Sequence, residues 1–167
     1  MITTLDPYRF AEIVSLLITK NDAFTFLATL DRFVDGLYKK DTSAEAFLDK
    51  EMAFGLRNVL LKQLAQESVA LGNVKDVRKF VQDLKDSIKA IEVVTISMAI
   101  EANELEVKKI GAWFTSNKKE KVLLNFVKDV SLVGGSIIAF NGLLKDYTLK
   151  KVLQEKFKKK ELRTFLK

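Results

Sequence analysis

The apolar residues of this chain change their spacing near residue 90, and that change limits the folds open to it. Over residues 10–88 they recur every three or four positions, which places them on one side of α-helices. Over residues 91–96 the chain is instead rich in β-branched residues, which favour strands. The sequence therefore predicts an α+β protein that is mostly α. We expect an N-terminal helical bundle over residues 1–90, followed by a small C-terminal α/β domain with a β-hairpin over residues 91–167.

The first part of the chain predicts a bundle of about five helices joined by short turns. Asp6-Pro7 is typical of an N-cap with proline at the first helical position, and Asn21-Asp22 is expected to begin the second helix. Ser43 ends a break in the pattern and caps the third helix. We expect the fourth helix to continue to Val69 and to end at Gly72-Asn73, where the fifth begins.

The second part predicts the order strand, helix, strand, strand, helix. The strands are expected near residues 91–96, 121–127 and 133–140. Asn141-Gly142 is a strong signal for a hairpin turn, because both positions of such a turn need a positive φ. Asp146 is expected to cap a final helix that carries apolar residues at helical spacing.

The paired glycines Gly134 and Gly135 raise the question of a phosphate-binding loop. Such a loop needs spaced glycines, a lysine followed by Ser or Thr, and a helix directly afterwards. Here the strand-forming segment SIIAF follows, and Gly-Lys-Ser/Thr occurs nowhere in the sequence. Paired glycines that enter a strand instead indicate a bulge, or a place where another backbone passes closely. We interpret the segment as architecture.

The 167 residues include no cysteine and no histidine. This excludes disulfides, thiol nucleophiles and Ser-His-Asp catalysis, and it removes the usual ligands of zinc. The sequence therefore offers no catalytic residue of these kinds and indicates no metal or cofactor, while lysine chemistry is not excluded. Carboxylate chemistry stays open through Glu101, Glu104 and Glu106, although such acids are more typical of the solvated face of a helix. The apolar runs are too short to span a bilayer and residues 1–10 lack a signal pattern, so we expect a soluble protein.

The formal net charge is +6, and the lysines gather late in the chain. A basic surface can bind nucleic acid or anionic lipid, or it can simply keep a terminal helix soluble. Trp113 and Phe114 lie near Lys118-Lys119 in the sequence, which favours nucleic-acid binding among these alternatives. On this hypothesis the protein is a basic nucleic-acid-binding helical adaptor. Against it, aromatic residues at helical spacing more often belong to a core, and the chain holds no nucleic-acid motif.

Residues 129–153, DVSLVGGSIIAFNGLLKDYTLKKVL, resemble the C-terminal signature of the F-type ATP synthase delta subunit, the oligomycin-sensitivity-conferring protein family. The matching positions are Gly134, Gly135, Gly142 and Asp146. Thr148 stands where the family generally has serine. Residues 91–99 and the following NELEVKKI resemble the strand and helix that open the family's C-terminal domain.

The N-terminal half resembles the same family more loosely. Asp6-Pro7-Tyr8, with Ala11 beyond, is similar to the family's opening Pro-Tyr-Ala helix, although Arg9 stands where alanine is usual. The bundle also lacks about one helix of the family pattern, between Lys50 and Leu56.

The resemblance implies a non-catalytic stator subunit that joins the catalytic head of the synthase to its peripheral stalk. The bundle would receive the N-terminal helix of an α subunit between its first and penultimate helices, while residues 91–167 would bind the stalk b subunits. The protein would be peripheral to a membrane, at the cytoplasmic face of a bacterial plasma membrane rather than an organellar inner membrane. By positional match the α-subunit contacts are Tyr8, Ala11, Ser15, Leu60, Leu64 and Val69, of which Leu60 and Leu64 are equally typical of a core. The stalk contacts are Leu149, Val152 and Phe157, provided that they are exposed.

Overall fold

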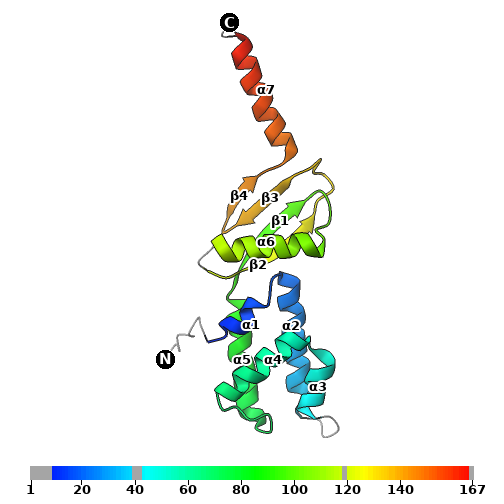
Figure 1. Ribbon diagram of the computed structural model, residues 1–167, viewed down its shortest axis with the longest axis vertical. Helices are drawn as coiled ribbons and strands as arrows, with labels where there is room; N and C mark the ends of the chain where they lie inside the picture. The colour runs from blue at the N-terminus through cyan, green and yellow to red at the C-terminus, as the bar shows by residue number, and fades with distance from the viewer. Residues whose placement is uncertain (1–8, 39–42, 118–119, 166–167) are drawn as a thin grey trace. The chain divides into compact units, whose positions relative to one another are not determined.

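The computed structural model describes residues 9–38, 43–117 and 120–165. The described chain is mostly helical, with a four-stranded sheet in its C-terminal part, which confirms the predicted α+β class (Figure 1). The chain divides into two compact units, Met1–Glu92 and Val93–Lys167. The expected Asp6-Pro7 cap and Tyr8 lie outside the described residues.

Five helices make up the described part of the first unit, as the spacing predicted, and we call them the bundle. They are α1 (Ala11–Ser15), α2 (Lys20–Gly36), α3 (Ala44–Glu51), α4 (Phe54–Gln66) and α5 (Val74–Lys89). Met52 and Ala53 alone separate α3 from α4. The core lies where the apolar sides of the helices meet, and the rings of Phe10 and Phe80 contact edge to face with centroids 5.4 Å apart.

Side-chain caps define the starts of several helices. The helix expected to begin at Asn21-Asp22 begins at Lys20, because Thr19 forms a capping box with Asp22. The Thr19 hydroxyl accepts the Asp22 N–H at 3.0 Å, and the Asp22 carboxylate accepts the Thr19 N–H at 2.8 Å. Ser43 caps α3, as predicted, by accepting the Ala46 N–H at 3.1 Å.

The end of α4 differs from the expectation. The helix stops at Gln66, and Ser68 adopts a left-handed conformation with φ 54°. The Ser68 N–H donates to the Ala65 carbonyl and the Val69 N–H to the Leu64 carbonyl, which is a Schellman ending built on a residue other than glycine. Val69 therefore lies beyond the helix, and the Gly72-Asn73 signal marks only the start of α5.

The C-terminal unit contains one strand more than predicted. Its elements are β1 (Glu92–Met98), α6 (Glu104–Asn117), β2 (Val122–Lys128), β3 (Ser136–Phe140), β4 (Leu143–Asp146) and α7 (Leu149–Phe165). The strands lie in the order β2-β1-β3-β4. The extra strand is β4, a short edge strand that pairs antiparallel with β3. Its four residues were too few to stand out between the hairpin turn and the final helix.

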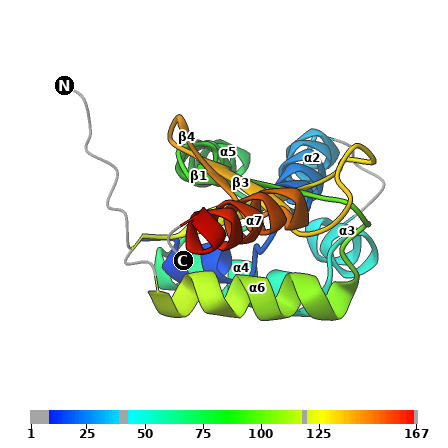
Figure 2. The same ribbon diagram turned by 90° about the horizontal axis from the view of Figure 1, so that it is seen from above.

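The sheet combines a crossover unit with a hairpin. Hydrogen bonds from Asn125 to Thr95 and from Asp129 to Met98 advance in the same direction along β2 and β1, which makes these strands parallel. The helix α6 connects them and lies along one face of the sheet in both views (Figures 1 and 2). Beyond β1, β3 and β4 form the predicted hairpin, with φ 48° at Asn141 and 74° at Gly142.

Candidate partner-binding surfaces

The first surface expected from the sequence lies along α1 and α4, which pack against each other. Ala11 and Ser15 occupy successive turns of α1 and are exposed. Leu60 and Leu64 are 0% and 2% exposed, so they are core residues of α4. Val69 is half-buried in the turn after α4. Of the predicted contacts within the described residues, the two small residues of α1 are therefore the ones that reach solvent.

An ion pair links these two helices at the surface. The Lys62 ammonium of α4 lies 2.8 Å from the Glu12 carboxylate of α1, and Leu16 just beyond α1 is 44% exposed. Sequence reasoning missed the pair, because the two residues lie fifty positions apart. The exposed border between α1 and α4 therefore offers small, charged and apolar side chains together, which suits an amphipathic partner helix.

A second ionic cluster begins at Arg9, directly before α1. Its guanidinium donates to the Glu67 carboxylate, with Nη2 2.5 Å from Oε2 and Nε 3.0 Å from Oε1. Its Nη1 lies 2.6 Å from the Asp83 carboxylate of α5. The hydrogen bonds to Glu67 raise the pKa of Arg9 above its usual range, while those from Arg9 hold the pKa of Glu67 below its usual range. The cluster thus joins three parts of the bundle at one guanidinium.

The second predicted surface lies on α7. Every described side chain of this helix, from Leu149 to Lys158, is exposed. Leu149, Val152 and Leu153 are 42–45% exposed, and Phe157 is 63% exposed. Their spacing of three, four and eight positions places them on one side of the helix. The condition set for the predicted stalk contacts, that these side chains be exposed, therefore holds.

The joint between the sheet and α7 explains the paired glycines. Gly135 has φ 81°, and a Cβ there would lie 2.3 Å from the Tyr147 carbonyl oxygen. The Leu149 N–H donates to the Gly134 carbonyl at 2.9 Å. Another backbone therefore passes closely at this point, as the sequence predicted. Gly142, by contrast, has open space around its Cα and is needed only for its positive φ of 74°.

Asp146 does not cap α7 as expected, because it is the last residue of β4. Its carboxylate accepts the Thr148 N–H at 2.8 Å, which holds the pKa of Asp146 below its usual range. The Thr148 hydroxyl instead accepts the Lys151 N–H at 3.3 Å and caps the helix. The threonine at the family's serine position therefore keeps the hydroxyl that this cap requires.

Two of the residues behind the alternative functions, Phe114 and Glu106, have structural roles, and Lys118-Lys119 lie outside the described residues. Phe114 is a core residue of α6 and contacts the exposed Trp113 edge to face at 5.0 Å. Glu106 and Asn103 exchange two hydrogen bonds of 3.0 Å in a box at the start of α6. Glu101 and Glu104 are exposed nearby. These contacts add nothing in favour of nucleic-acid binding or carboxylate catalysis.

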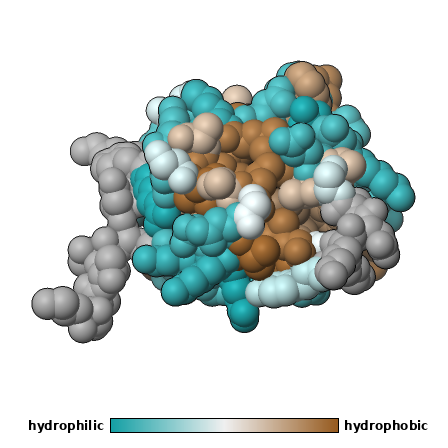
Figure 3. Space-filling view, turned by 90° about the horizontal axis from the view of Figure 1, so that it is seen from below, coloured by the Kyte–Doolittle hydropathy of each residue, from teal (hydrophilic) through white to brown (hydrophobic). Residues whose placement is uncertain are grey.

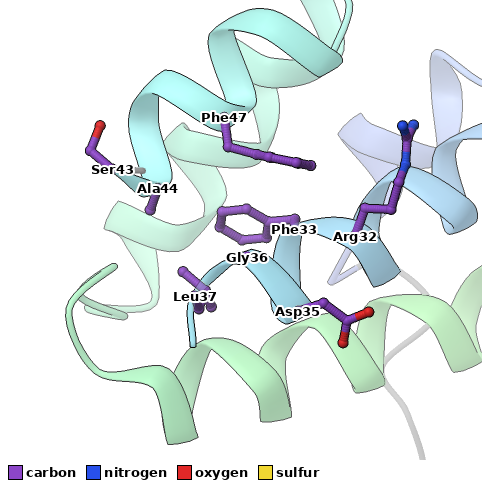
Figure 4. A pocket seen from close by; sticks show the side chains of 8 residues that line it. All are labelled: Arg32, Phe33, Asp35, Gly36, Leu37, Ser43, Ala44 and Phe47. Atoms are coloured by element: carbon purple, nitrogen blue, oxygen red, sulfur yellow. The ribbon is translucent and has the colours of Figure 1, made fainter. Parts of the chain in front are cut away.

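One apolar hollow lies at the end of the bundle where α2 finishes and α3 begins. Figure 3 shows apolar side chains gathered on this face within a hydrophilic rim. The hollow holds about 300 Å³, and in Figure 4 the rings of Phe33 and Phe47 face it, with centroids 6.1 Å apart. Its charged lining residues are Arg32 and Asp35, and Arg32 is paired with Glu51 at 2.8 Å. The described lining residues therefore include no pair of groups suited to general acid–base catalysis.

No helix within the described ranges has the length and apolar character to cross a membrane. A search of the curated proteins found no match to the chain. Residues 10–160 match the family model described as ATP synthase delta (OSCP) subunit, which is most of the 167 residues. The chain therefore belongs to the ATP synthase delta (OSCP) subunit family, whose members are non-catalytic subunits of the synthase stator.

Proposed function

We propose that this subunit joins the catalytic head of the synthase to its peripheral stalk. In this proposal the bundle binds the N-terminal helix of an α subunit, and the C-terminal unit binds the stalk b subunits. The observation that supports it best is α7, whose described side chains are all exposed although they include an apolar stripe. A contiguous apolar surface of this kind marks a site of protein interaction.

At the stalk, apolar contact supplies most of the binding energy. Burial of apolar area stabilises by about 25 cal/mol per Å². Exposed ion pairs contribute only about 0–1 kcal/mol each. Lys150, Lys151 and Lys158 are exposed on α7 and therefore orient an acidic partner helix more than they hold it. Leu149, Val152 and Phe157 form the main contact.

At the head, small side chains allow a close helix–helix approach. Ala11 and Ser15 are exposed one turn apart on α1, and a partner helix that lies over them can come near the backbone. Tyr8 belongs to the same segment of sequence and would add an aromatic contact with a polar end. Because both contacts belong to one chain, the second forms at a high effective concentration, and the joined assembly resists a rotating load.

The head contact can be tested by calorimetry with a peptide of the cognate α-subunit N-terminus. Ala11→Trp places a bulky group on the proposed surface and is expected to weaken binding by more than about tenfold. Ala28→Trp is the matched control, because Ala28 is an exposed alanine of α2. Tyr8→Ala is expected to cost about 1–3 kcal/mol, or roughly 5- to 150-fold. Equal affinities for the wild type, Ala11→Trp and Tyr8→Ala would reject this surface.

The stalk contact can be tested by co-purification with the b subunits. Phe157→Asp introduces a charge into the apolar stripe of α7, and we expect it to abolish recovery of b. Phe54→Asp is the control, since Phe54 is 73% exposed but lies on α4 of the bundle. If Phe157→Asp retains b as well as the wild type does, α7 is not the stalk surface. Through these contacts the subunit would be held at the cytoplasmic face of a bacterial plasma membrane, and it should leave the membrane fraction with the released catalytic head and stalk.

A further inference from the structure

The helix that carries the proposed head contact is too short to keep its own orientation. The helix α1 spans five residues, Ala11–Ser15, and isolated helices of this length are unstable in water. It is held by burial of Phe10, Ile13 and Leu17, each at most 2% exposed. Burial of these residues sets which side of α1 faces the bundle, and the exposed Glu12–Lys62 pair adds a weak link to α4.

Arg9 adds directional contacts at the start of this segment. The planar guanidinium donates from Nε and Nη2 to both oxygens of Glu67, and from Nη1 to Asp83. Paired hydrogen bonds between an arginine and a carboxylate fix geometry as well as distance. Glu67 is the C-cap residue that directly follows α4, and Asp83 lies within α5. The start of α1 is therefore tied to two other helices from one side chain.

The surroundings make this cluster stronger than a surface ion pair. The side chains of Arg9, Glu67 and Asp83 are only 23–28% exposed. The Arg9 guanidinium also lies 4.6 Å from the centre of the Phe10 ring and 5.8 Å from that of Phe80. Partial burial reduces screening by salt, and the aromatic faces attract the cation.

From this geometry we infer that Arg9 is a positioning residue, which holds α1 in the orientation that the α-subunit helix binds. The inference rests on the proposed head contact. Ala11 and Ser15 follow Arg9 by two and six positions, so their placement depends on how the start of α1 is fixed. If α1 holds its place for only a fraction of the time, the apparent affinity falls by that fraction.

The test compares Arg9→Ala with Lys85→Ala by calorimetry against a synthetic peptide of the cognate α-subunit N-terminus. Lys85 is the matched control, because its side chain is 15% exposed and its ammonium pairs with Asp31, which joins α5 to α2. We expect Arg9→Ala to weaken peptide binding about tenfold or more, since charged hydrogen bonds of this kind contribute strongly. Lys85→Ala should stay within about twofold of the wild type. The affinity of Arg9→Lys should be intermediate, because lysine keeps the positive charge but lacks the paired N–H donors of the planar guanidinium.

Hydrogen exchange without any peptide separates positioning from general destabilisation. The amides of Val14 and Leu17, which donate to the carbonyls of Phe10 and Val14, report on α1. In Arg9→Ala they should exchange faster while the amides of α5 keep their protection. If Arg9→Ala does not fold, Glu67→Gln removes the same charge pair and keeps a side chain of equal size.

The outcomes distinguish the two proposals. A wild-type protein that does not bind the peptide overturns the proposed head contact and, with it, the role of Arg9. A wild type that binds and an Arg9→Ala variant of equal affinity overturn the role of Arg9 alone. An Arg9→Ala variant with weak binding but uniformly faster exchange, matched by Lys85→Ala, also contradicts positioning, because it shows a loss of overall stability.

Discussion

The bundle and the C-terminal unit differ in how much of their apolar side chains they bury. The bundle contains most of the fully buried large residues, among them Phe33, Leu60 and Leu84, and its helices are tied together by ion pairs. The C-terminal unit contains most of the exposed large apolar residues, several of them on β4 and α7. A region that buries its apolar area is stable by itself, whereas one that leaves it in water gains from a partner. We therefore expect substitutions of the buried apolar residues of the bundle to change mainly stability, and substitutions of the exposed apolar residues of α7 to change mainly assembly.

The largest change in stability is expected for Leu60→Ala in the bundle. Leu60 is 0% exposed, so its truncation leaves a cavity in the core of the bundle. We expect the free energy of unfolding to fall by about 2–5 kcal/mol. Urea denaturation followed by circular dichroism measures it. Leu153→Ala, on the exposed side of α7, should change it by no more than about 0.5 kcal/mol. Equal losses at the two sites would remove the contrast.

A smaller loss is expected at the joint of the C-terminal unit. Gly135→Ala would place a methyl group 2.3 Å from the Tyr147 carbonyl oxygen, in addition to the cost of a positive φ. We expect a destabilisation of about 2–3 kcal/mol. Trp113, the single tryptophan, lies in this unit and its fluorescence reports the unfolding. Gly142→Ala has open space and should cost about 1 kcal/mol. If both variants cost the same, the close approach is not what selects glycine at Gly135.

The response to acid should distinguish the Arg9 cluster from the rest of the bundle. Hydrogen bonds from Arg9 hold the pKa of Glu67 lower in the folded protein than in the unfolded chain. The stabilisation is therefore complete above the unfolded pKa of about 4.3, and it is lost as the pH falls through the lower folded value. Glu67→Gln should be less stable than the wild type at pH 7, and the difference should shrink at acidic pH. Stability curves measured by urea at several pH values test this. A difference that stays constant with pH would show that the Glu67 charge contributes nothing.

The smallest change in stability is expected for Phe157→Ala. Phe157 is 63% exposed, so its truncation should alter the free energy of unfolding by less than about 0.5 kcal/mol. Recovery of the b subunits in a pulldown should nevertheless fall, because the side chain is proposed to be buried there. Reduced recovery together with a large loss of stability would mean that α7 contributes to the fold as well as to assembly.

Local signals predicted the fold better than they predicted the surfaces. The apolar stripe of α5, the Ser43 cap and the Asn141-Gly142 turn depend on neighbouring residues, and all three are present in the structure. The end of α4 was missed because a serine takes the left-handed position that glycine usually marks. Asp146 was predicted to cap the final helix but is the last residue of β4, because an acidic residue at the end of a strand and one that caps a helix look alike in sequence.

The ionic contacts of the bundle could not be predicted, because they join distant parts of the chain. Arg9 meets Glu67 and Asp83 across 58 and 74 positions, and a single sequence gives no sign of such pairing. In the sequence Arg9 stood out only as a departure from the family's alanine. The burial of Leu60 and Leu64 could not be predicted either, for another reason. Helical spacing does not distinguish apolar residues of a core from apolar residues of a binding surface.

The joint at Gly135 has a mechanical consequence for a stator subunit. The base of α7 is attached to β3 and its preceding loop through backbone groups, with the Tyr147 N–H bonded to the Ser136 carbonyl and the Leu149 N–H to the Gly134 carbonyl. A force along α7 would thus be shared by these two backbone hydrogen bonds and by the covalent chain itself. In the proposed assembly, the glycine at position 135 therefore keeps α7 attached closely to the sheet, and torsion in the stalk would reach the sheet through these backbone hydrogen bonds.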